Sequence, residues 1–192
     1  MPILGVIASS TRQGQATDTG AMFPIFATTV GSAGAASVTF SNIPSTYTHL
    51  QLRTYTRSTN GNSNDAGGMN TTFNSDTTAS YAFHYMIASG GGTNQITTGN
   101  ASSNTNFVMG FTNSSNYNAT NYSGSIVDIL EYKNTSKLKT VRAYGGNDGN
   151  TAGFVWFCSG LWQKTNAITS ITITPWSGSF TQYSTLALYG LK

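Results

Sequence analysis

The sequence predicts an all-β protein, an antiparallel two-sheet sandwich of jelly-roll type with a short extended N-terminal arm. Apolar residues recur at every second position, threonine and the aromatic residues are abundant, and clusters of Gly, Asn and Ser interrupt the chain at short intervals. Helical periodicity is almost absent. Antiparallel strands that are joined by turns, without crossover helices, favour such a sandwich or else a closed barrel.

The length of the chain sets its domain organisation. Its 192 residues suffice for one large β domain with a buried core, but not for two full domains. We therefore expect a single sandwich domain over residues 23–192, preceded by an arm over residues 1–22.

The arm is predicted from a change in composition near the N-terminus. Met1 to Ala8 is apolar, whereas Ser9 to Gly20 is a polar spacer rich in Gly, Ser, Thr and Gln. At about 3.3 Å per residue, such an arm reaches about 65 Å when fully extended, which is enough to span a neighbouring subunit. A frayed terminus and an additional edge strand are the two other interpretations.

The segment from Tyr47 to Arg57 shows the strand alternation most clearly. One face carries Leu50, Leu52, Thr54 and Thr56, and the other carries His49, Gln51, Arg53, Tyr55 and Arg57. We expect the first face to be buried and the second to lie in solvent or at an interface.

Nine further strands are expected from the same pattern. They are Phe26 to Val30, Ala36 to Phe40, Tyr81 to Ala88, Phe107 to Phe111, Ser123 to Tyr132, Lys139 to Tyr144, Phe154 to Leu161, Ala167 to Thr174 and Ser184 to Leu191. Apolar residues occupy both faces of the Ser123 to Tyr132 segment, which indicates a central strand.

Four polar stretches are expected to be loops, because they lack apolar spacing and are rich in residues that tolerate turns. They are Thr59 to Gly68, Ser89 to Asn106, Thr112 to Asn121 and Gly145 to Gly153. Long polar loops on a rigid scaffold are where binding surfaces often lie.

The composition indicates a neutral surface rich in hydroxyl groups. Ser, Thr, Asn and Gly number 23, 30, 18 and 21, whereas charged residues make up only 8%, against an average of about 25%. Aromatic residues at 12% and a net charge of +3 argue against disorder. The sequence contains no apolar stretch long enough to span a membrane and no basic run of the kind that binds nucleic acid, so neither partner is expected.

The sequence offers little to a catalytic or metal site. A sugar hydrolase needs two carboxylates about 5 to 10 Å apart, but Asp128 and Glu131 point to opposite sides of their predicted strand. His49 and His84 belong to no metal-binding motif, so we expect structural roles for both. Cys158 lies in an intensely apolar strand and should be a buried, inert thiol. We predict no enzymatic activity, no cofactor and no metal.

Aromatic residues form three clusters along the chain. They are Tyr81, Phe83 and Tyr85; Phe154, Trp156, Phe157 and Trp162; and Trp176, Phe180, Tyr183 and Tyr189. Such rings fill cores, concentrate at subunit interfaces and stack on sugars. Packing in the core is the first interpretation, and an interface or a sugar site are the alternatives.

Four segments resemble a family of tailed-bacteriophage virion proteins. They are Ser37 to Arg53; Phe73 to Asp76 with Tyr81 and His84; Ile126 to Thr135 with Lys139 to Arg142; and Ser159 to Trp162 with Ala167 to Thr172 and Leu188 to Lys192. The first ten residues are also similar to the N-terminus of that family. The resemblance covers most of the chain and implies a structural role in the virion, without catalytic residues.

The resemblance and the neutral surface favour a capsid decoration or cement protein on the outer surface of the virion, bound to the major capsid protein lattice. We expect a homotrimer, because apolar residues occupy both faces of several strands. Ile3, Leu4, Val6 and Ile7 are the expected capsid-docking residues of the arm, and Gln51, Arg53, Tyr55 and Arg57 form a candidate interface. The alternative function is a tail-fibre or receptor-binding module that recognises host surface glycans.

Overall fold

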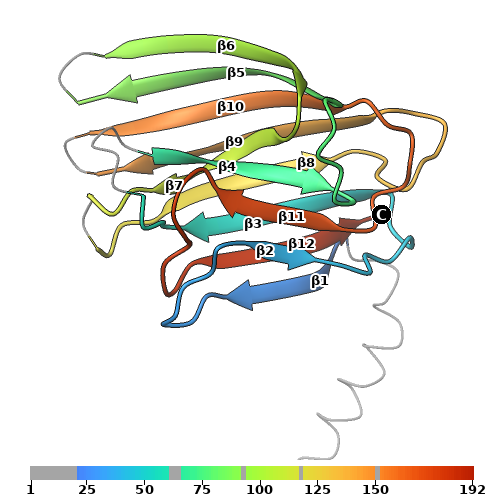
Figure 1. Ribbon diagram of the computed structural model, residues 1–192, viewed down its shortest axis with the longest axis horizontal. Helices are drawn as coiled ribbons and strands as arrows, with labels where there is room; N and C mark the ends of the chain where they lie inside the picture. Colours follow the sequence, from blue (N-terminus) through green and yellow to red (C-terminus); the bar gives the residue numbers. More distant parts are fainter. Residues whose placement is uncertain (1–20, 61–65, 92–93, 117–118, 150–151) are drawn as a thin grey trace, which may run out of the picture.

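The computed structural model describes residues 21–60, 66–91, 94–116, 119–149 and 152–192 (Figure 1). Over these residues the chain forms twelve β-strands and no helix. The strands make two antiparallel sheets, which confirms the predicted all-β two-sheet sandwich. Its assignment to the jelly-roll type stays a prediction. β1 begins at Met22, one residue before the predicted start of the sandwich domain.

The larger sheet contains eight strands. Their order is β1 (Met22–Thr29), β12 (Thr185–Leu191), β3 (His49–Thr56), β8 (Ser123–Ile129), β9 (Lys139–Asp148), β10 (Gly153–Trp162), β5 (Tyr81–Gly90) and β6 (Gln95–Asn104). β8 lies between β3 and β9, so the prediction of a central strand in this region is confirmed. Strands distant in sequence thus become neighbours, as β12 does between β1 and β3.

The smaller sheet contains four strands and covers one face of the larger sheet (Figure 1). Their order is β2 (Val38–Phe40), β11 (Ile171–Pro175), β4 (Ala66–Phe73) and β7 (Phe107–Asn113). The other face of the larger sheet, which we call the outer face, points away from the smaller sheet.

Aromatic rings from both sheets interlock at the centre of the core. Phe73 and Phe107 come from the smaller sheet, and Tyr81 and Trp162 come from the larger one. The ring centroids of Tyr81 and Phe107 are 4.8 Å apart, and those of Phe73 and Trp162 are 5.6 Å apart. All four side chains are buried, so core packing is confirmed for Tyr81 and Trp162 of the predicted aromatic clusters.

Two strands were not expected from the sequence. β6 lies in the predicted loop from Ser89 to Asn106, and its residues are mostly exposed because it forms an edge of the larger sheet. β6 has small residues opposite the aromatic residues of its neighbour β5. Gly99 is opposite Tyr85, and a β-carbon at Gly99 would lie 2.5 Å from the Tyr85 ring. β4 has no period-two pattern of apolar residues, since Gly67, Gly68 and Asn70 interrupt it.

Candidate functional site

The outer face of the larger sheet is the most extensive candidate interaction surface. Along each strand, alternate side chains point into the core and onto this face. In β10 the core receives Trp156 and Cys158, while Val155 and Phe157 lie on the outer face. The sequence of β10 is apolar at both sets of positions, and such two-sided apolar strands are the signal in the sequence that pointed to a second contact surface.

Apolar side chains line up across this face. Met86, Phe157, Tyr144 and Ile126 occupy directly opposed positions on β5, β10, β9 and β8, and we call these four residues the apolar row. Met86, Phe157 and Tyr144 are between 42% and 52% exposed, and neighbouring Val155 is 53% exposed. A contiguous exposed apolar patch of this kind marks an interaction site more often than scattered apolar residues do.

A polar network occupies the next part of the face, on β3, β8 and β9. The Arg53 Nε donates to Gln51 Oε1 at 2.9 Å, and Gln51 Nε2 donates to Asp128 Oδ1 at 2.9 Å. Asp128 Oδ2 lies 3.9 Å from Arg142 Nη2. The Arg53 guanidinium also lies over the Tyr189 ring, 5.5 Å from its centroid. The network fixes these long side chains beside the apolar row.

The structure brings together three of the four predicted interface residues. Gln51, Arg53 and Tyr55 share the outer face, as the alternation in β3 requires. Arg57 lies beyond the end of β3 and is half-buried; its Nη2 donates to the Ser115 carbonyl at 3.0 Å. Arg57 therefore holds a connection at the end of the sandwich. The predicted docking residues Ile3, Leu4, Val6 and Ile7 lie outside the described residues.

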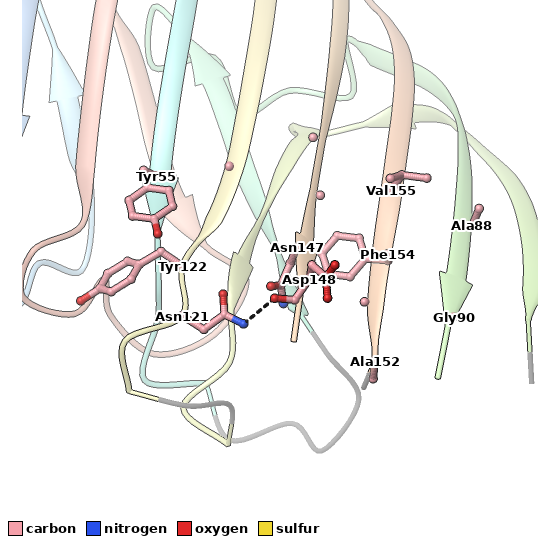
Figure 2. A pocket seen from close by; sticks show the side chains of 14 residues that line it. Tyr55, Ala88, Gly90, Asn121, Tyr122, Asn147, Asp148, Ala152, Phe154 and Val155 are labelled. Carbon is pink, nitrogen blue, oxygen red and sulfur yellow. Dashed lines mark hydrogen bonds between the residues drawn. The ribbon is translucent and has the colours of Figure 1, made fainter. Parts of the chain in front are cut away.

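A hollow of about 840 Å³ opens at one end of the outer face (Figure 2). Tyr55 and Tyr122 form one side, and Val155 and Ala88 form the other. The hollow is a shallow depression that is widely open to solvent. Sequence reasoning placed Tyr55 in an interface but missed the hollow, because its walls come from strands far apart in the chain.

Glycines form the floor of this hollow. Gly124 of β8 and Gly146 of β9 are directly opposed, so two neighbouring strands carry no side chain here on the outer face. A β-carbon at Gly146 would lie 2.4 Å from the Phe154 carbonyl oxygen, whereas one at Gly124 would meet nothing within 4 Å. The predicted loop from Gly145 to Gly153 is therefore wrong at its start, since β9 continues to Asp148.

Two stacked tyrosines form the aromatic side of the hollow. The ring centroids of Tyr55 and Tyr122 are 5.2 Å apart with an interplanar angle of 25°. The Tyr122 hydroxyl donates to the Gln182 carbonyl at 2.8 Å, which fixes the pair against the loop before β12. Asn121 Nδ2 donates to the Asp148 carbonyl at 3.0 Å, across the open end of the hollow.

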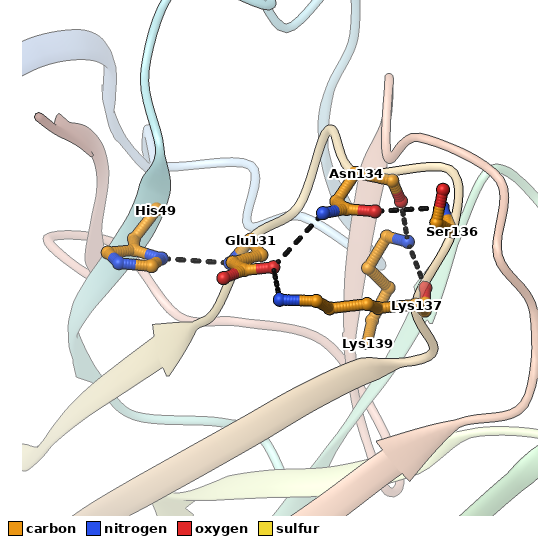
Figure 3. Close-up of polar contacts among 6 residues, drawn as sticks. All are labelled: His49, Glu131, Asn134, Ser136, Lys137 and Lys139. Carbon is orange, nitrogen blue, oxygen red and sulfur yellow. Dashed lines mark hydrogen bonds and ion pairs between the residues drawn. The ribbon is translucent and has the colours of Figure 1, made fainter.

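A charged cluster at the opposite end of the strands holds the β8–β9 connection together (Figure 3). Glu131 adopts a positive φ of 46°, and its backbone N–H donates to His49 Nδ1 at 2.8 Å. Its carboxylate accepts from Lys137 at 2.8 Å and from Asn134 at 3.1 Å. The Lys137 ammonium is the main cause that holds the pKa of Glu131 below its usual value. These contacts confirm a structural role for His49.

Lys139 is fully buried beneath the same connection. Its ammonium donates to the carbonyls of Asn134, Lys137 and Thr165, the last at 2.9 Å. Burial lowers the pKa of Lys139, and the three carbonyls compensate for the lost hydration of the ammonium. We assign this cluster to folding.

Cys158 and His84 lie on opposite faces of the larger sheet. Cys158 is buried, as predicted, and burial raises its pKa to about 12. His84, in contrast to the expectation, lies exposed on the outer face. Across the described ranges, no group of three or more His, Cys, Asp or Glu could hold a metal ion. Nor do these ranges include a helix long and apolar enough to cross a membrane.

Comparison with protein-family models and with curated proteins finds no match to this chain. The resemblance to tailed-phage virion proteins therefore stays a prediction.

Proposed function

We propose that this protein is a non-enzymatic structural protein of a tailed-bacteriophage virion, a capsid decoration or cement protein on the outer surface of the capsid. In this proposal its copies associate as a homotrimer through the apolar row on the outer face of the larger sheet, which leaves the end of that face around Tyr55 open, and the N-terminal arm, residues 1–22, docks on the major capsid protein. The observation that carries the proposal is the apolar row, in which Met86, Phe157 and Tyr144 are exposed and Ile126 is half-buried.

The position of the apolar row suits an interface between subunits. The row crosses four of the eight strands of the larger sheet, so a neighbouring subunit can cover it without covering the whole outer face. At about 25 cal/mol per Å² of apolar surface, burial of the row contributes several kcal/mol.

The composition supports a particle component present in many copies. With 8% charged residues, neighbouring copies on a lattice repel one another little. Repetition over a lattice also turns a weak contact into a stable one, because each additional contact acts at a high effective concentration.

Sedimentation of the purified chain tests the self-association. We expect a trimer at micromolar concentration, and a monomer for the Met86→Ser/Phe157→Ser double variant. Leu138→Ser is the matched control, since Leu138 is 44% exposed but lies in the connection that follows β8, away from the row. A monomeric wild-type chain would refute the interface, and a dimer that the double variant dissociates would refute the threefold arrangement.

The copy number in purified particles tests the location in the virion. Decoration implies hundreds of copies per particle, because the capsid lattice repeats many times. Tens of copies or fewer would contradict decoration and favour the tail-fibre or receptor-binding alternative. Electron microscopy of particles labelled on this protein distinguishes capsid from tail directly.

A further inference from the structure

We infer that the hollow between Tyr55 and Val155 binds a neutral sugar, one pyranose unit of an oligosaccharide, with its apolar face on the Tyr55 ring. This inference goes beyond the proposed structural role and does not depend on it. A pyranose is amphipathic, with an apolar face and a rim of hydroxyl groups, and the hollow presents matching groups to both.

The aromatic wall is exposed and held in place before any ligand arrives. Tyr55 is 51% exposed, and Tyr122 stacks on it with a centroid distance of 5.2 Å. The hydrogen bond from Tyr122 to the Gln182 carbonyl restrains the second ring. A ring whose orientation is already fixed loses little conformational entropy on binding.

The glycine floor makes room for a ring-sized ligand beside Tyr55. Because Gly124 and Gly146 are opposed on neighbouring strands, the hollow reaches down to the backbone of the sheet. Space remains above Gly124, where a β-carbon would meet no atom within 4 Å. A side chain at Gly124 would fill the space that we assign to the sugar, whereas a β-carbon at Gly146 would clash with the Phe154 carbonyl oxygen.

The chemistry of the lining favours a neutral ligand. Among the described residues that line the hollow there is no Lys or Arg, and Asp148 is the one acidic residue. A phosphate, sulfate or carboxylate group would find no cation there. The Asn121 amide and the Tyr55 hydroxyl are groups that can exchange hydrogen bonds with sugar hydroxyls. A purely apolar ligand would fit the neighbouring apolar row better than this mixed lining.

Binding of defined oligosaccharides to the full chain tests the inference. The probes are maltotetraose, cellotetraose and chitotetraose, with a sulfated heparin tetrasaccharide as the charged comparison. We expect at least one neutral probe to give saturation-transfer signals and to shift the backbone amide resonances of Tyr55, Gly124 and Val155. The heparin probe should give neither. No binding of any neutral probe up to about 20 mM, where even a contact weaker than 1 mM is detected, would overturn the inference.

Substitutions separate this site from other surfaces. Gly124→Leu should abolish sugar binding, since its side chain enters the hollow without a clash at the β-carbon. Ala27→Leu is the matched control, because it adds the same side chain to the outer face on β1, away from the hollow. Tyr55→Ala should weaken binding about tenfold, whereas Tyr55→Phe keeps the ring and should retain most of it. Unchanged binding in Gly124→Leu would refute the site.

Sugar binding and self-association are measured separately, so either proposal can fail without the other. If Gly124→Leu weakens self-association and no neutral probe binds, the hollow is part of the subunit interface and the sugar inference is refuted. If a probe binds in the hollow of a chain that sediments as a monomer, the sugar inference stands and the proposed assembly is refuted.

Discussion

Asp76 shows how a single residue fastens the two sheets. Its carboxylate accepts four hydrogen bonds: from Thr78 N and Oγ1 at 2.9 and 2.6 Å, from Ser80 Oγ at 2.6 Å and from Trp162 Nε1 at 2.8 Å. Its backbone carbonyl accepts from the Tyr81 hydroxyl at 2.9 Å. Asp76 thus ties the connection between β4 and β5 to the end of β10.

Acid should therefore weaken the fold through Asp76. Burial opposes its ionisation, but the hydrogen bonds from Ser80, Thr78 and Trp162 outweigh that effect and hold the pKa of Asp76 well below its usual value of 3.8. Because the folded-state pKa is depressed, the stabilisation is complete above about pH 5 and is lost as the pH falls below 4. We expect Asp76→Asn to lower the free energy of unfolding at pH 7 by about 1 to 3 kcal/mol.

The pH dependence of the free energy of unfolding shows whether the charge of Asp76, and not only its side-chain shape, stabilises the fold. Urea unfolding at several pH values should show the difference between wild type and Asp76→Asn shrinking from pH 5 to pH 2. A difference that stays constant over this range would mean that the carboxylate charge is not what stabilises the turn.

Asn74 joins two segments that are distant in the sequence. It adopts a positive φ of 51°, and its Nδ2 donates to the Ala167 carbonyl at 2.8 Å. Its Oδ1 accepts from the backbone N–H groups of Thr169 and Ser170 at 2.8 and 3.1 Å. The side chain of Asn74 thus holds the turn after β4 against the segment before β11.

At the scale of elements, strands that bury one face were predictable and exposed strands were not. β3 alternates between Leu50, Leu52 and polar residues because its inner face lies in the core. β6 contacts β5 along one edge only and has few buried side chains, so its sequence carries no apolar alternation. Its adjacent Thr97 and Thr98 were the remaining signal for a strand, but Thr is also common in the loops of this chain.

Two glycines in central strands should respond oppositely to substitution. On the inner face of β10, a β-carbon at Gly160 would lie 2.6 Å from the buried Phe107 ring, whereas at Gly124 on the outer face of β8 it would meet nothing. We expect Gly160→Ala to lower the free energy of unfolding by about 1 to 3 kcal/mol. Gly124→Ala should be neutral or should stabilise the strand by about 0.5 kcal/mol.

A second substitution tests the cause of the Gly160→Ala effect. If crowding against Phe107 is responsible, Phe107→Leu should cost less in the Gly160→Ala background than in wild type, and thermal unfolding of all four proteins gives this coupling energy. Strictly additive effects would show that the Phe107 contact does not determine the response.

At the scale of the whole molecule, the candidate site depends on strand order, which a pattern within each strand does not contain. Tyr55 and Val155 are a hundred residues apart, and they face one hollow because β8 and β9 lie between β3 and β10. Gly145 and Gly146 were expected in a loop, because adjacent glycines are typical of turns. In the structure the same pair lies within β9. The sequence predicted an outward face on β3 but not the surface to which that face belongs.

In our proposal the sandwich folds on its own, and residues 1–22 bind the capsid. Deletion of residues 1–20 should leave the melting temperature of the purified protein within about 2 °C of wild type, a change of no more than about 1 kcal/mol in the free energy of unfolding, because β1 begins at Met22 and pairs with β12 along its length. The same deletion should abolish incorporation into particles, and substitution of Ile3, Leu4, Val6 and Ile7 by Ser should reproduce that loss. Arg12→Ala is the control and should change neither the melting temperature nor the incorporation into particles.

Unfolding or aggregation of the truncated chain would identify the segment as an integral strand. Continued decoration of particles by a folded truncated chain would move the capsid contact to the sandwich, where the exposed side of Gln51, Arg53 and Tyr55 is the next surface to mutate.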